Sequence, residues 1–291
     1  MPIRRLPFQA LASLLLSVGL MGLPAHAQVA KTVELSNGNS KVLVDLGSLG
    51  VYDWTVDGVN QVFRANTYPG PLGELYFLNL GQEPNRPEVG LNTFTLNTFE
   101  QRATNALTAS FTGFGGILDF QYDMELQGGQ IGSGFSSRYE TVTLINRSNT
   151  SQEISLFSYL DFEIAQTYRD DTLLIEGGSL TQSDPTGTKA IVTVDQLPDN
   201  FEAGTYPILF TKLALDGGRT TLNGQNSVVN GDGSAILQFN RVLAPGESAV
   251  FRFLKQIEKT STQDVPEPGI VIALSSTAVA GLLLKKFKKA D

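Results

Sequence analysis

Apolar and polar residues alternate along much of the chain, most clearly over residues 118–126. The even positions of this stretch are apolar, and its odd positions include the acids Asp119, Asp123 and Glu125. A period of two is typical of a β-strand that turns one face toward a core and the other toward water. We therefore expect the three acids to lie on the wet face of a sheet.

Residues 154–164 show the same alternation. Asp161 and Glu163 fall on the polar face, two positions apart, so the pattern predicts solvated side chains there. Phe157 and Tyr159 lie on the same face. Large aromatic side chains are seldom left in water over a whole strand, which indicates that this face is partly covered.

Shorter runs of the same kind fill residues 28–259, separated by turns rich in glycine, asparagine and aspartate. No stretch between the two chain ends shows a helical period. We expect an all-β ectodomain, a single large antiparallel β-sandwich of the supersandwich kind, although glycine-rich residues 128–137 leave open a division into two sandwiches. The further predicted strands are 41–46, 51–56, 75–80, 93–99, 106–111, 139–146, 172–176, 190–195, 208–215, 235–239 and 249–257.

Residues 1–27 have the three parts of a secretory signal peptide. Arg4 and Arg5 give a positive start, residues 10–20 form an apolar run, and Ala25 and Ala27 frame a small-x-small cleavage site. The run is shorter than the ~20 residues that a membrane-spanning helix needs. We expect cleavage after Ala27 and export to the cell envelope or the extracellular space.

The other end of the chain also has parts in a fixed order. A polar spacer at 260–264 is followed by the motif Val265, Pro266, Glu267 and Pro268. An uncharged segment at 269–284 comes next, and the basic end contains Lys285, Lys286, Lys288 and Lys289. Such a segment can halt at a membrane as a helix, with its lysines held on the cytoplasmic side.

This tail, residues 265–291, resembles the PEP-CTERM sorting signal. The resemblance implies a C-terminal transmembrane helix as the membrane contact and processing by an exosortase, a membrane protease. Residues 54–59, 159–163 and 243–248 also resemble, loosely, parts of cyanobacterial-type exported proteins of unknown function that carry the same tail. That second resemblance implies location and fold, and it carries no catalytic residues.

The amino-acid composition excludes several classes of catalytic and metal-binding site. The one histidine, His26, lies in the predicted signal peptide, and the chain has no cysteine. Histidine- or cysteine-based catalysis, zinc or haem ligation and disulfides are therefore excluded for the ectodomain. A formal net charge of −8 repels nucleic acid and could attract Ca²⁺ or basic partners.

Three kinds of candidate site remain, each beside an ordinary structural explanation. Asp161 and Glu163 are a carboxylate pair of the kind that glycosidases use, or two solvated side chains. Trp54, the only tryptophan, is a sugar-stacking platform or a core residue. The acidic loops at 170–171 and 230–233 offer oxygen ligands for Ca²⁺, or are simple turns. We expect no resident metal or cofactor, with Ca²⁺ as the one exception left open.

Taken together, these patterns favour an exported surface or matrix protein with a structural or adhesive role and without enzymatic activity. Polysaccharide is the expected partner. The first alternative is a carbohydrate-binding module, which an exposed aromatic strip around Trp54 would indicate. The second is a carboxylate-dependent glycosidase or lyase, which two converging acids in a cleft would indicate.

Overall fold

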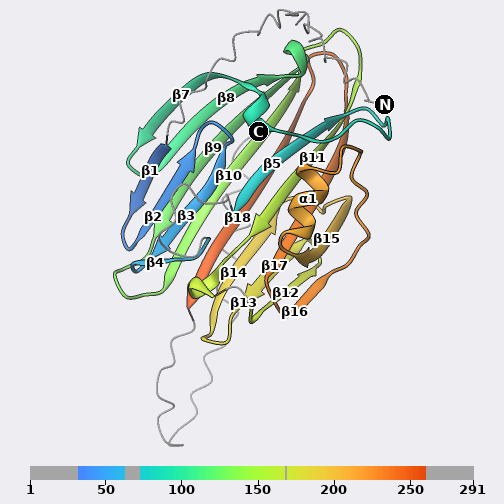
Figure 1. The fold of residues 1–291 in the computed structure, drawn as a ribbon. Coiled ribbons are helices and arrows are strands. Elements are labelled where there is room, and N and C mark those ends of the chain that lie inside the picture. The colour runs from blue at the N-terminus through green and yellow to red at the C-terminus, as the bar shows by residue number, and fades with distance from the viewer. Residues whose placement is uncertain (1–31, 63–72, 168, 260–291) are drawn as a thin grey trace, which may run out of the picture.

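The computed structural model describes residues 32–62, 73–167 and 169–259, and these form two antiparallel β-sheets (Figure 1). The described residues contain eighteen strands, three short 3-10 helices and one α-helix. The predicted all-β, antiparallel fold is confirmed. Nowhere in these ranges does a helix have the length and apolar character needed to cross a membrane. The predicted signal peptide, spacer and tail lie outside the described residues.

The first sheet, sheet A, has nine strands, with β11 near its centre between β5 and β17. In spatial order its path is β1 (Thr32–Asn37), β2 (Ser40–Asp45), β3 (Gly50–Val56), β5 (Glu74–Leu80), β11 (Gln152–Asp161), β17 (Gly233–Leu243) and β15 (Asn200–Thr205). Two short strands pair at its side: β4 (Val59–Asn60) with β3, and β6 (Val89–Gly90) with β5.

The second sheet, sheet B, also has nine strands. In spatial order these are β16 (Ser227–Gly231), β12 (Asp171–Glu176), β13 (Ser179–Ser183), β14 (Thr188–Val194), β18 (Ser248–Lys259), β10 (Phe135–Asn146), β9 (Leu118–Gly128), β8 (Ala106–Gly113) and β7 (Thr95–Ala103). The glycine-rich stretch 128–137 joins β9 to β10, which pair along their lengths. It is a hairpin within one sheet and does not divide two sandwiches.

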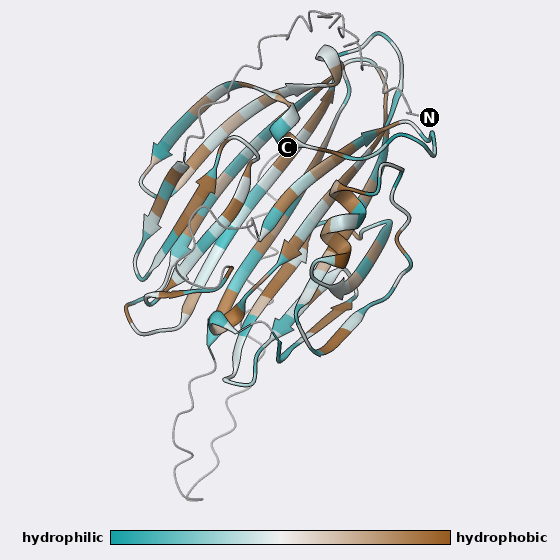
Figure 2. Cartoon of the chain, in the orientation of Figure 1, coloured by the Kyte–Doolittle hydropathy of each residue, from teal (hydrophilic) through white to brown (hydrophobic). Residues whose placement is uncertain are grey.

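The two sheets enclose one large hydrophobic core, to which strands of both contribute. Figure 2 shows hydrophobic and hydrophilic residues alternating along the strands of both sheets. On β9 the apolar positions are all buried, whereas Asp119 and Asp123 are half-exposed and Glu125 is exposed. The predicted wet face of this strand is confirmed. Thr112 and Arg147 contact Asp119 there, and Arg102 pairs with Asp123.

The segment 208–215 is a helix and not the predicted strand. Helix α1 (Ile208–Ala214) lies on the outer face of sheet A, where Leu209 and Leu213, four residues apart, are buried. They pack with Phe157 and Tyr159 of β11 in a second, smaller core. Residues four apart share one face of a helix, and the aromatic residues of β11 supply the apolar surface that this face covers.

Four charged side chains are buried between the two sheets. Glu74 of sheet A contacts Arg138 of β10 at 2.5 Å and also Lys255 of β18. Glu140 pairs with Arg138 at 2.8 Å and with Lys255 at 3.1 Å. Burial would raise the pKa of Glu140, but Lys255 and Arg138 outweigh it and hold that pKa below its usual value. We call these four residues the buried ion network.

Breaking this network is expected to be costly. Glu74→Gln leaves two buried cations facing one carboxylate, and removing one member of a buried ion pair typically costs about 3–5 kcal/mol. Urea unfolding should show a loss of that order. The exposed Glu125→Gln on β9 is the control and should stay within about 0.5 kcal/mol of the unaltered chain. A loss below about 1 kcal/mol for Glu74→Gln would mean that the network does not hold the sheets together.

Candidate functional site

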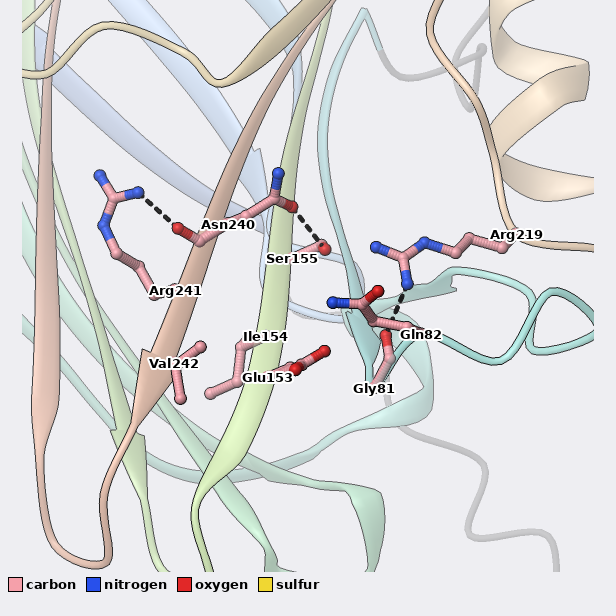
Figure 3. Close-up of a pocket in the computed structure, with 9 residues that line it drawn as sticks. All are labelled: Gly81, Gln82, Glu153, Ile154, Ser155, Arg219, Asn240, Arg241 and Val242. Carbon is pink, nitrogen blue, oxygen red and sulfur yellow. Dashed lines mark hydrogen bonds between the residues drawn. The ribbon is translucent and has the colours of Figure 1, made fainter.

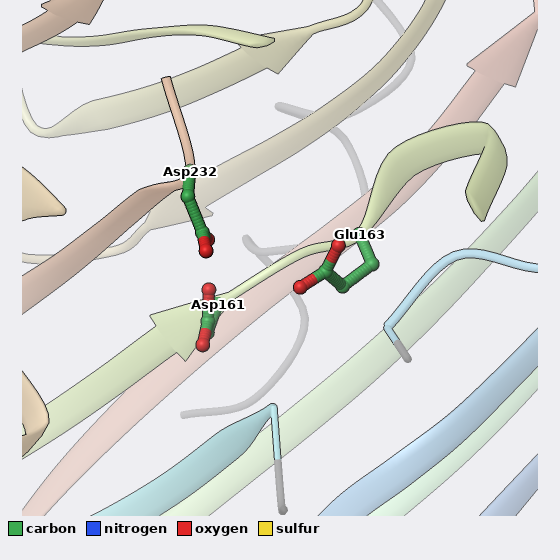
Figure 4. Close-up of side chains that lie close together, drawn as sticks. All are labelled: Asp161, Glu163 and Asp232. Atoms are coloured by element: carbon green, nitrogen blue, oxygen red, sulfur yellow. The ribbon is translucent and has the colours of Figure 1, made fainter. Parts of the chain in front are cut away.

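Three carboxylates meet where β11 ends and β17 begins. β11 ends at Asp161, and Glu163 follows two residues later. Because β17 runs antiparallel to β11 and pairs Ser234 with Asp161, the preceding turn brings Asp232 beside them. One carboxylate oxygen from each of these three residues lies within 4.8 Å of the other two, and Figure 4 shows the side chains gathered from both segments. We call Asp161, Glu163 and Asp232 the carboxylate cluster.

Asp161 is the buried member, with 8% of its surface exposed. Its Oδ2 accepts a hydrogen bond from the Tyr159 hydroxyl at 3.0 Å. Its Oδ1 has no hydrogen-bond partner among the residues that the structure describes. Burial, together with the charges of Asp232 and Asp171, raises the pKa of Asp161 to about 7, although the Tyr159 hydrogen bond opposes the shift.

The other two members are half-buried and lie on connecting segments. The backbone N–H of Glu163 donates to the Gln61 carbonyl at 3.1 Å, which fixes the chain just after β11. Burial raises the pKa of Asp232, and the positive charge of Arg169 partly counteracts it. The cluster is therefore placed by backbone pairing and by a fixed turn.

A second layer of polar groups lies behind the cluster. Gln182 of β13 is fully buried, and its side-chain amide donates to the Phe162 carbonyl at 2.7 Å and to Asp171 at 2.6 Å. Since Phe162 lies between Asp161 and Glu163, sheet B holds the peptide that carries both acids. Burial raises the pKa of Asp171 to about 7, the Gln182 hydrogen bond opposes the shift, and Asp170 adds to it.

Such a group of carboxylates has a limited set of chemical uses. Its oxygens can accept hydrogen bonds from hydroxyl groups, hold a cation, or take and return protons. All three uses need the oxygens to face a common point, and this geometry provides one.

The structure corrects the expectation that Asp161 is a solvated side chain. It shares the outer face of β11 with Phe157 and Tyr159, and that face lies in the smaller core under α1 and not in water. The sequence signal was the pair of aromatic residues on the polar face. Glu163 lies beyond the end of the strand and is half-buried.

Trp54 is a core residue and not an exposed sugar-stacking platform. Its ring is fully buried between the sheets, and its Nε1 donates to the Ser136 hydroxyl at 3.0 Å. The guanidinium of Arg138 lies 4.5 Å from the ring centroid. Trp54 therefore packs around the buried ion network. It does not form the exposed aromatic strip that a carbohydrate-binding module would present.

The two acidic loops contribute residues both to the carboxylate cluster and to the solvent-exposed surface. Asp232, from the 230–233 turn, joins the cluster, and Asp171 is buried in the layer behind it. Asp170 is exposed. Sequence reasoning named these loops and the Asp161–Glu163 pair as separate candidates, and it did not include Gln182. Only strand pairing between distant segments brings them together.

A separate hollow of about 340 Å³ lies on sheet A, lined by Glu153, Ser155, Asn240, Arg241 and Arg219 among others (Figure 3). Several of its polar groups bond within the protein. Arg219 donates to the Gly81 carbonyl, Arg241 donates to Asp199, and Ser155 donates to Asn240. Because these groups already have partners, this hollow is the weaker candidate.

Solved structures with a similar fold include carbohydrate-active enzymes and their homologues. A bacterial glucoamylase complexed with acarbose has a TM-score of 0.54 at 6% identity, over 80% of this chain and 34% of that chain. An aldose epimerase homologue from Caenorhabditis elegans has a TM-score of 0.51 at 9% identity, over 80% and 100% of the two chains. A galactose mutarotase related enzyme from Lactobacillus acidophilus has a TM-score of 0.50 at 10% identity, over 80% and 99%. No family model matches the sequence, and no curated protein matches it.

These findings correct predictions made from the sequence. The PEP-CTERM identity is wrong as a description of this chain, because the similar structures are mutarotase-like. The exosortase and the transmembrane helix that it implied concern residues 265–291, which lie outside the described ranges. The predicted structural or adhesive role without enzymatic activity is wrong for the same reason, since the fold is one that enzymes acting on carbohydrates share. At such low identity the similarity shows the fold alone.

The raised pKa of Asp161 predicts a pH dependence of stability. Its ordinary pKa is 3.8 and its folded value is about 7, so the folded chain binds more protons than the unfolded chain between these values. The free energy of unfolding should therefore fall as the pH rises from about 4 to about 7. Asp161→Asn removes this contribution and should reduce the fall by at least about 1 kcal/mol.

The measurement is urea unfolding at several pH values in buffer that contains a chelator, so that no bound cation alters the charge balance. The exposed Glu125→Gln is the control, and it should follow the unaltered chain at every pH. Parallel pH curves for Asp161→Asn and the unaltered chain would contradict the burial of an ionisable Asp161.

Proposed function

We propose that this protein is a carbohydrate-processing enzyme and that the carboxylate cluster is its reactive centre. The observation that carries the proposal is the convergence of Asp161, Glu163 and Asp232 at one end of a mutarotase-like fold. Carboxylates that meet from separate segments have little structural value to the fold, because like charges in contact repel. Their convergence is better explained by a ligand that needs them.

The reaction class follows from the residues available. With no histidine in the described residues, the groups suited to proton transfer near neutral pH are carboxyl groups. At the anomeric centre of a free sugar, one group takes the proton of the anomeric hydroxyl while another donates a proton to the ring oxygen. The ring opens, and closure on the other face with the reverse transfers restores both groups. Sugar hydroxyls also donate hydrogen bonds to the carboxylates.

The hydrolysis of a glycosidic bond uses the same pair of roles, with the leaving sugar's oxygen protonated and water attacking. A polysaccharide or oligosaccharide is then the substrate. We propose anomer interconversion as the first reaction to measure, because the structures that match over nearly their whole length include an aldose epimerase homologue and a galactose mutarotase related enzyme.

We also propose that the protein is exported, with residues 1–27 as a cleaved signal peptide. The three-part pattern of that segment supports this. Mass spectrometry of the protein purified from its native host should find Gln28 as the first residue. Chains that keep Met1 and remain in the cytoplasm would contradict export.

The proposed activity is tested with the full chain, galactose, glucose and a panel of oligosaccharides, with calcium added and with chelator. Proton NMR follows the exchange between anomers and the release of reducing ends. We expect catalysis above the spontaneous rate, and we expect Glu163→Gln and Asp232→Asn each to lower kcat/KM by about 100-fold or more, the range typical of lost acid–base groups.

Glu125→Gln, an exposed carboxylate on β9, is the matched control and should keep full activity. Glu153→Gln tests the separate hollow on sheet A. The proposal is overturned if no sugar is converted faster than in buffer, or if activity is lost with Glu153→Gln while the cluster variants keep it.

A further inference from the structure

We propose that the carboxylate cluster is a calcium site. Asp161, Glu163 and Asp232 each supply one oxygen, and carboxylate oxygens are the ligands that Ca²⁺ prefers. The link to a sugar reaction rests on the proposed function, but the binding of the ion stands on the geometry alone and can be measured alone.

The spacing of the three oxygens suits this ion. If all three pairs were 4.8 Å apart, a point between them would lie about 2.8 Å from each oxygen, since 4.8 divided by √3 is about 2.8. Ca²⁺–oxygen distances are about 2.3–2.6 Å, which correspond to oxygens about 4.0–4.5 Å apart. An inward movement of at most a few tenths of an ångström is therefore needed to complete the contacts. Mg²⁺ binds oxygen at about 2.1 Å, demands near-octahedral geometry and gives up its water reluctantly, so a site built from protein carboxylates suits it less well.

A second observation points to a ligand at this position. Asp161 is more than nine-tenths buried, and its Oδ1 has no hydrogen-bond donor among the described residues. A buried ionised carboxylate is unfavourable unless it is hydrogen-bonded, paired with a cation or bound to a metal. The Tyr159 hydroxyl satisfies only Oδ2, which leaves Oδ1 without a donor among the described residues, and the Asp161 carboxylate lies beside those of Glu163 and Asp232.

The local charge also favours a divalent cation. With all three carboxylates ionised the cluster carries −3, and the guanidinium of Arg169, whose charge acts on Asp232, contributes +1, which leaves −3 + 1 = −2. Asp171, whose charge also acts on Asp161, adds to the negative side. A doubly charged cation offsets most of this excess, whereas an anionic sugar or a phosphate would be repelled.

The ion would also connect the cluster to a carbohydrate. Ca²⁺ takes about 6–8 oxygen ligands, so three or more positions remain for water or for sugar hydroxyls. A hydroxyl bound to a cation loses its proton more readily. Each carboxylate supplies one ligand oxygen, and the carboxylate of Asp232 would accept that proton through its second oxygen.

The experiment is isothermal titration calorimetry of the full chain, stripped with chelator, against calcium chloride alone, with magnesium chloride as a parallel arm. We expect one site per chain with a Kd below about 1 mM, in the range of extracellular calcium modules, and weaker binding of Mg²⁺. Asp232→Asn should raise the Kd at least tenfold. Glu125→Gln should leave it unchanged, which controls for diffuse attraction to an acidic surface.

Asp161→Asn gives a second readout that a folding defect cannot imitate. It should abolish the rise in melting temperature that Ca²⁺ causes, and it should raise the melting temperature of the calcium-free protein because a buried charge without a counter-ion has been removed. The proposal is overturned if the unaltered chain shows no saturable binding up to about 10 mM, or if both variants bind Ca²⁺ as it does.

Failure of the calcium site and failure of the proposed function look different. If the chain binds one Ca²⁺ and converts no sugar, the calcium site is supported and the proposed enzymatic function is overturned. If the chain converts sugars equally well with chelator and binds no Ca²⁺, the proposed enzymatic function is supported and the calcium site is overturned.

Discussion

The buried ion network is the constraint on which the rest of the structure depends. Arg138 and Lys255 of sheet B face Glu74 of sheet A, so the two sheets can pack only in the register that pairs these charges. Any other register would bury an unpaired charge, at a cost larger than most single mutations cause. The network therefore selects one arrangement of two sheets that share an otherwise non-directional apolar core.

That constraint extends to the carboxylate cluster through the backbone. Glu74 begins β5, where it pairs with Leu160 of β11, and the preceding Gly73 carbonyl accepts the N–H of Asp161 at 2.7 Å. A methyl group on Gly73 would lie 2.6 Å from the Asp161 carbonyl oxygen, so this approach needs glycine. Fixing Glu74 in the core thus fixes the end of β11. The contrast is informative: Glu74 is buried with two cations, whereas Asp161 is buried beside other acids.

Local patterns predicted the strands and could not predict the site. The alternation at 118–126 identified β9 correctly because one strand needs only its own sequence to separate a wet face from a buried one. The same alternation predicted that Asp161 is exposed to water. That prediction failed because the pattern within one strand carries no information about α1, which is formed by residues 208–214 and covers Phe157 and Tyr159. Asp232 reaches Asp161 only through the pairing of β17 with β11, a contact about 70 residues apart in sequence. Sites of this kind depend on sheet topology, which short-range periodicity does not encode.

The most direct test is a crystal structure of the full chain soaked with terbium, as a calcium substitute, and with galactose. The anomalous signal should give one metal peak among the oxygens of Asp161, Glu163 and Asp232, with sugar hydroxyls bound to the same ion. A sugar ordered instead in the hollow beside Glu153 and Arg241, with no metal at the cluster and the Oδ1 of Asp161 hydrogen-bonded to a donor of the protein, would contradict the assignment of this site.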